Sequence, residues 1–200
     1  MKRHGIGLFL TLAALSAPSM AQAHLVNSGV GPFYDGALHL ILSPMDIVRL
    51  LALCLFAGAQ GPASARSIVL SAPVAWFLAG LAALVFGATA TFDIANAVTL
   101  LLIGAAIAAD LKLPQKIATA LAAAYAGFLG FQAGVALQPD NADWVALLGT
   151  TAVAGAIVLA ATALIASATA FPLRVGCRVL GSWAAAVGLL SIGWIIAMAK

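Results

Sequence analysis

The chain has 200 residues, of which 64% are hydrophobic and only 8% are charged. Because soluble domains carry about 25% charged residues, this composition excludes a water-exposed globular fold and indicates an integral membrane protein, surrounded by the lipid bilayer. The net charge of +3 comes from basic residues scattered singly over short loops, which excludes a nucleic-acid-binding surface.

The first 23 residues have the pattern of a secretory signal peptide. A basic start over residues 1–4 precedes the short apolar core Gly5–Leu15, and Ala21-Gln22-Ala23 has the small-x-small form that signal peptidase accepts. We expect cleavage after Ala23, which makes His24 the new N-terminus and places a free α-amine beside its imidazole. The alternative is an uncleaved anchor, which would give seven spans.

Six further apolar segments follow, each of about 20 residues. The predicted fold class is therefore all-α: a polytopic transmembrane helix bundle of six spans after a cleavable signal peptide. The division is a signal peptide over 1–23, a periplasmic N-terminal segment over 24–37 and a transmembrane domain over 38–200. The predicted spans are Leu38–Gly58, Ile68–Ala88, Ile94–Ala109, Ile117–Leu137, Trp144–Ala170 and Val179–Ala199.

Charge alternates between successive loops. Basic residues occupy every second loop, and the loops between them hold aspartates and no basic residue. The positive-inside rule predicts that the basic loops are cytoplasmic and the mature N-terminus periplasmic, in a bacterial inner membrane. Only Lys200, at the predicted outer end, departs from this pattern. The basic residues are Arg66, Lys112, Lys116, Arg174 and Arg178, and the aspartates are Asp93, Asp140 and Asp143.

The start of the first span contains ionisable residues inside an apolar run. Asp35 and His39 are an i, i+4 pair, and His39 and Asp46 are seven residues apart, so we expect them on one helix face. Pro44 is expected to kink this helix and to free the carbonyl of Leu40. The side chains and this carbonyl would then offer a ladder of oxygen and nitrogen ligands to a metal ion.

Two interpretations of Asp46 stay open. In one, Asp46 and Arg49, three residues apart, form an intramembrane ion pair and only neutralise one another. In the other, the Asp46 and His39 pair has a function, since a charged side chain at the bilayer centre costs at least about 2.5 kcal/mol. The candidate metal ligands are then His24, Asp35, His39 and Asp46.

Three stretches of the chain resemble the HupE/UreJ family of bacterial membrane proteins. They are the signal peptide with His24 and the segment from Gly36 to Asp46, then Leu101–Pro114, then Arg178–Leu190. The resemblance implies a role in nickel or cobalt handling for hydrogenase and urease.

The chain departs from the family pattern at two places. The family's Asp-His pair on the first span is replaced by Asp46-Ile47, one residue further from His39. The family's His-Gly-x-x-His-Gly pattern on the fourth span corresponds to Phe128–Gly134, which keeps the glycines and loses both histidines. Nickel and cobalt favour imidazole ligands. Without these two histidines, three alternatives stay open: the chain binds a harder cation, binds its cation weakly, or does not transport metal.

The leading hypothesis is a secondary permease or binding protein for a nickel-like or cobalt-like divalent cation, which is its substrate rather than a resident cofactor. The alternative is a non-transporting accessory protein that docks a metalloprotein through the segment His24–Asp35, with Phe33 and Tyr34 as contacts. An enzyme is the least expected class, because no nucleophile–base set is visible and no catalytic residue is assigned. The sequence leaves the oligomeric state open.

Overall fold

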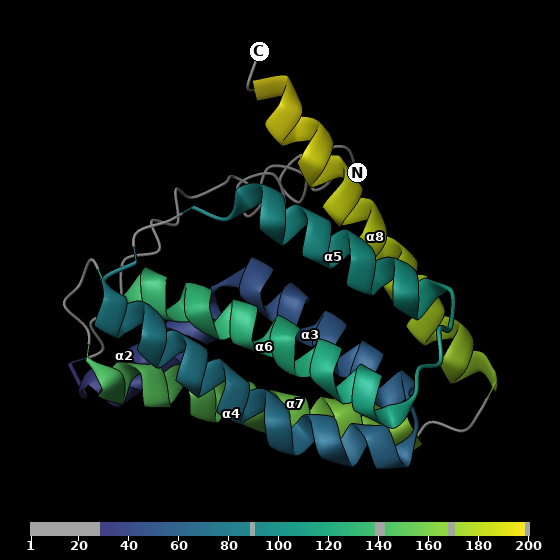
Figure 1. The fold of residues 1–200 in the computed structure, drawn as a ribbon, viewed down its shortest axis with the longest axis horizontal. Helices are drawn as coiled ribbons and strands as arrows, with labels where there is room; N and C mark the ends of the chain where they lie inside the picture. Colours follow the sequence, from purple (N-terminus) through teal and green to yellow (C-terminus); the bar gives the residue numbers. More distant parts are fainter. Residues whose placement is uncertain (1–28, 89–90, 139–142, 168–170, 199–200) are drawn as a thin grey trace, which may run out of the picture.

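The computed structural model describes residues 29–88, 91–138, 143–167 and 171–198, and these residues form helices and no strand (Figure 1). The predicted signal peptide and His24 lie outside the described residues. The helices are α2 (Pro32–Leu42), α3 (Pro44–Ala59), α4 (Pro62–Phe86), α5 (Asp93–Ala108), α6 (Gln115–Leu137), α7 (Trp144–Ser167) and α8 (Phe171–Met198).

The apolar helices confirm an all-helical, multi-pass membrane protein. Within the described ranges, α4, α6, α7 and α8 are each long and apolar enough to cross a bilayer, and α2 with α3 counts as a bent fifth candidate. α5 is apolar but has only 16 residues. The count of six spans therefore stays a prediction.

The first predicted span is not one continuous helix. α2 ends at Leu42 and α3 begins at Pro44, and the two helices are bent by 79°. Ser43 between them is extended, at φ −93° and ψ 93°, which is the conformation that a following proline favours. Pro44 occupies the start of α3, where its missing N–H costs nothing. The predicted free carbonyl of Leu40 is wrong, because the Ser43 N–H donates to it at 3.3 Å.

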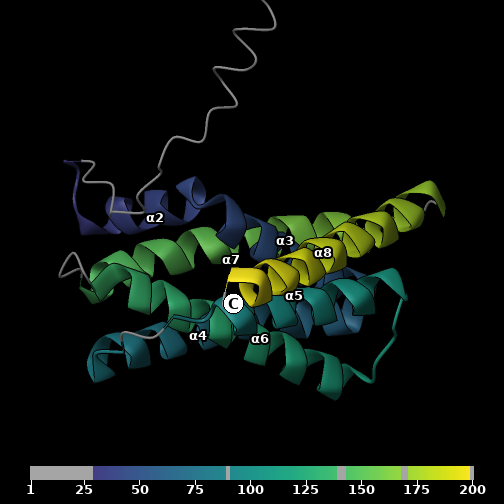
Figure 2. The same cartoon turned by 90° about the horizontal axis from the view of Figure 1, so that it is seen from above.

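α3 is the central helix of the bundle and contacts every other helix of the described chain. Its buried residues run almost continuously from Leu50 to Gly58. Around it, α2 lies along α7, and α4 lies along α6 (Figure 2). Small residues allow this close approach: a Cβ added to Gly36 would overlap the carbonyl of Ala146, and one added to Gly130 would overlap the backbone of Trp76.

α5 and α8 form a separate pair at one side of the bundle (Figure 1 and Figure 2). Their backbones approach closely where Gly104 lies against Ala185 and where Gly188 lies against Leu101. The pair contacts the remaining helices mainly through α3. This arrangement leaves room for a cleft between α3 and the pair.

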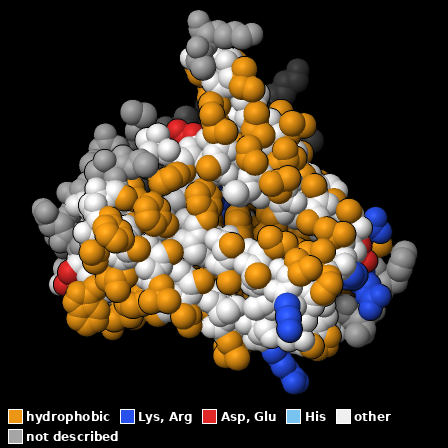
Figure 3. All heavy atoms as spheres, viewed as in Figure 1, with side chains coloured by type: hydrophobic (Ala, Val, Ile, Leu, Met, Phe, Trp, Pro, Cys, Tyr) orange, Lys and Arg blue, Asp and Glu red, His pale blue; other side chains and the backbone are white. Residues whose placement is uncertain are grey.

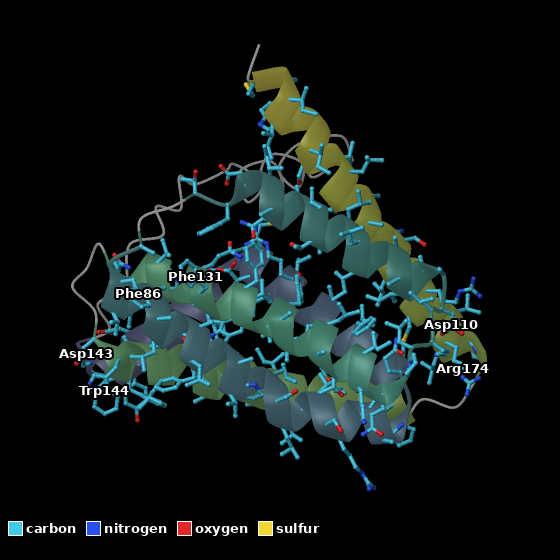
Figure 4. The ribbon with its side chains drawn as sticks, in the orientation of Figure 1. Phe86, Asp110, Phe131, Asp143, Trp144 and Arg174 are labelled. Atoms are coloured by element: carbon cyan, nitrogen blue, oxygen red, sulfur yellow. The ribbon has the colours of Figure 1, made fainter. Side chains whose placement is uncertain are left out.

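Charged side chains gather at the two ends of the bundle. Figure 3 shows lysines and arginines at one end and an apolar surface between the ends. Asp110 and Arg174 lie at that end, and Asp143 and Trp144 lie at the opposite end (Figure 4). The Arg178 Nε group donates to the carbonyl of Ala108 at 3.0 Å, which ties α8 to α5 there. This segregation supports the predicted loop pattern, while the side that faces the cytoplasm stays a prediction.

Candidate metal-binding cavity

A small cavity of about 130 Å³, lined by both polar and apolar side chains, lies among α2, α3, α4, α6 and α7. Since a water molecule takes about 30 Å³ of liquid volume, the space suits a cation that keeps a few of its waters. The residues that line the cavity are His39, Leu40, Asp46, Trp76, Leu129, Gln132, Ala133, Ala136 and Thr150.

The contact between α2 and α7 brings His39 to this cavity. Gly36 lies against Ala146, and His39 and Thr150 follow these residues by three and four positions, which is one helical turn. The two side chains are therefore on the facing sides of their helices. His39 is only 7% exposed and Thr150 is fully buried.

The bend at Ser43 brings Asp46 to the same cavity. The expected shared helix face of His39 and Asp46 is wrong, because the helix breaks between them, yet the structure places both side chains on one cavity. Asp46 lies in the first turn of α3, where the helix dipole favours a negative charge. Its Oδ1 atom accepts a hydrogen bond from the Arg49 Nη1 group at 2.9 Å. The predicted ion pair is thus present.

Three further polar side chains line the cavity, and the sequence analysis missed them. The Thr150 hydroxyl donates to the carbonyl of Leu147 at 2.9 Å, which leaves oxygen lone pairs for a ligand. Gln132 supplies an amide, and the Trp76 Nε1 group is buried without a hydrogen-bond partner among the described residues. Gln132 could have been found as an amide in the middle of an apolar span.

The structure brings together two of the four predicted metal ligands. His39 and Asp46 line the cavity, Asp35 is buried in α2 but does not line it, and His24 lies outside the described residues. No group of three His, Cys, Asp or Glu side chains that could hold a metal ion occurs among the residues that the structure describes. A cation in this cavity would need neutral oxygens or water to complete its ligands, and the four-ligand set stays a prediction.

A larger cleft of about 1160 Å³ lies between α3, α5 and α8. Arg49 lines this cleft together with Asp93 and Asn96 at the start of α5. The Arg49 side chain is 15% exposed and that of Asp46 is 37% exposed. The two partners of one ion pair therefore line two different spaces.

The fold and the cavity define a multi-pass helical membrane protein with ionisable side chains between its helices. Residues 12–191 match the family model described as HupE / UreJ protein, and the chain therefore belongs to the HupE/UreJ family. No curated protein and no solved structure gives a significant match to the chain.

The family match covers every residue that lines the cavity. Leu129 and Ala133 directly precede Gly130 and Gly134, so they occupy the positions of the two histidines in the pattern that the resemblance implies. Both residues line the cavity. The chain thus has apolar side chains at two cavity positions where that pattern has imidazoles.

Proposed function

We propose that this protein is an inner-membrane permease or binding protein for a divalent transition-metal cation, with the cation held as substrate between His39 and Asp46. The observation that carries this proposal is that a histidine and an aspartate from two different helices line one small cavity between helices. Intramembrane ionisable residues are costly and usually mark ion pathways. Membership of the HupE/UreJ family supports the same class of function.

The donor atoms suit a first-row divalent cation. Imidazole nitrogen suits nickel, iron and zinc, and carboxylate and other oxygens suit harder cations. The Gln132 amide and the Thr150 hydroxyl add neutral oxygens, and water in the cavity supplies the rest. Nickel and cobalt are the cations that the family resemblance favours, and a cation gradient or a partner protein would drive movement, since no phosphate-binding loop occurs in the sequence.

Binding is tested by isothermal titration calorimetry, with Ni²⁺ and Co²⁺ titrated into the purified full-length protein. His39→Ala and Asp46→Asn should each weaken binding at least about tenfold, because the first removes a ligand and the second removes the negative charge of one. The matched control is Asp110→Asn, which removes a carboxylate that is ion-paired with Lys112 at the basic end, outside the cavity. Unchanged affinity in both cavity variants would refute the proposal.

Transport is tested separately in proteoliposomes that contain a metal-sensitive dye. A permease should carry Ni²⁺ or Co²⁺ into the vesicles, and Asp46→Asn should stop this uptake. Binding without uptake would leave the binding-protein form of the proposal and exclude the permease.

A docking role is a second candidate, and one observation favours it. The Phe33 and Tyr34 rings form an edge-to-face pair with centroids 5.6 Å apart, and they are 38% and 55% exposed at the start of α2. Aromatic side chains are common anchors in protein interfaces. The double variant Phe33→Ser/Tyr34→Ser should then lose co-purification with a metalloprotein but keep metal binding, and retention of the partner would count against docking at this site.

A further inference from the structure

The two partners of the Asp46–Arg49 ion pair line different spaces. Asp46 lines the cavity of about 130 Å³, and Arg49 lines the cleft of about 1160 Å³. Among the described residues, the Arg49 side chain makes one hydrogen bond, from Nη1 to Asp46. Its buried Nε has no hydrogen-bond partner among these residues. The Arg49 side chain is thus largely buried, at 15% exposure, but is held by a single hydrogen bond among the described residues.

We infer that Arg49 is a tethered competitor of the substrate cation: it occupies Asp46 while the cavity is empty and moves into the cleft when a divalent cation binds. This inference rests on the proposed function. In this role, Arg49 sets the affinity of the cavity for the divalent cation and neutralises the charge of Asp46 between two binding events.

Electrostatic repulsion favours such a movement. The Asp46 carboxylate and the Arg49 guanidinium together carry no net charge, so the empty ion pair is acceptable inside a membrane. A divalent cation added beside an unmoved Arg49 would leave two uncompensated positive charges at the site, whereas movement of Arg49 toward Asp93 leaves one there. The cleft offers room for the guanidinium, and Asp93 and Asn96 on its wall are polar groups that can receive it.

The test is a double-mutant cycle on metal affinity in the full-length protein. Arg49→Gln should bind Ni²⁺ or Co²⁺ at least about tenfold more tightly than the parent, because the competing charge is gone. Arg49→Lys should stay close to the parent, since it keeps a competing cation. In the Asp46→Asn background, Arg49→Gln should no longer raise the affinity for the metal ion, because the carboxylate for which Arg49 and the metal ion compete is absent.

A measurement on the unaltered chain covers the case in which Arg49→Gln does not fold. Phenylglyoxal modifies accessible arginines, and mass spectrometry locates the modified residue. Saturating Co²⁺ should increase modification of Arg49, while Arg178, which bonds to Ala108 at the basic end, should react equally with and without metal. Unchanged or reduced modification of Arg49 would overturn the inference.

The outcomes separate the inference from the proposed function. If the parent binds metal and Arg49→Gln is folded but binds no tighter, the competitor role is wrong and the binding site stands. If neither the parent nor Arg49→Gln binds Ni²⁺ or Co²⁺, the proposed function fails and the inference fails with it.

Discussion

Gly36 of α2 lies directly against the backbone carbonyl of Ala146 in α7, so closely that a single added Cβ atom would overlap it. The reverse contact is equally close, because a Cβ on Gly149 would overlap the carbonyl of Phe33. These two contacts set the distance between α2 and α7. They therefore also set how deeply His39 reaches into the cavity.

Gly36→Ala should push α2 away from α7. We expect a loss of about 1–3 kcal/mol in the free energy of unfolding, as for other overpacked sites, together with weaker Ni²⁺ binding because His39 moves outward. Thermal unfolding in detergent and metal titration measure the two effects. Gly127→Ala is the matched control, since its added Cβ would be 3.6 Å from the nearest atom, the carbonyl oxygen of Ala75. Equal behaviour of the two variants would contradict this account of the interface.

Ala133→His should strengthen binding of Ni²⁺. Ala133 lines the cavity, so the new imidazole would join His39 and Asp46 as a third ligand of the type that nickel favours. We expect the affinity for Ni²⁺ to rise about tenfold or more because of the extra nitrogen ligand. Titration of Ni²⁺ into the purified protein measures this change. The control Ala120→His places an imidazole on the same helix at an exposed position and should leave the affinity unchanged. A gain in both variants would point to binding outside the cavity.

The orientation of the bundle is tested by cysteine labelling in a chain that lacks Cys54 and Cys177. Thr91 and Leu111 are exposed in the turns before and after α5. A membrane-impermeant thiol reagent added outside should label Thr91→Cys and not Leu111→Cys, because the positive-inside rule places Lys112 in the cytoplasm. The opposite labelling pattern would invert the topology and the predicted periplasmic N-terminus.

Cleavage of the signal peptide is tested on the membrane-inserted protein. N-terminal sequencing should begin at His24, since Ala21-Gln22-Ala23 fits the signal peptidase pattern. The variant Ala23→Leu should remain uncut, and it serves as the control for the site. An intact Met1 in the parent protein would add a seventh span to the prediction.

The helical membrane fold could be predicted from the sequence because a bilayer imposes one simple rule, namely long apolar segments with internally satisfied backbones. The end of α6 at Leu137 agrees with the predicted span, and α7 begins at Trp144 as expected. The break at Ser43 was underestimated as a kink. A proline is well suited to the first turn of a new helix, and a serine before it marks a probable helix end, so the signal was present in the sequence.

Only some of the residues that line the cavity could be predicted from the sequence. Asp46 and His39 were noticeable because charged or titratable groups are rare inside apolar spans. Their meeting depends on the bend and on the contact of Gly36 with Ala146, which no local pattern determines. Thr150 could not be selected from the sequence, since whether a threonine faces a neighbouring helix or the lipid follows from how the helices are rotated and paired.

The shortness of α5 has a consequence for the bilayer around the protein. Its 16 residues span about 24 Å at 1.5 Å per residue, whereas the hydrocarbon core is about 30 Å thick. A bilayer thins beside a helix that is too short for it. α5 forms one wall of the cleft that Arg49 lines. If α5 is one of the six predicted spans, we expect lipid headgroups and water to come closer to this cleft than to the longer helices.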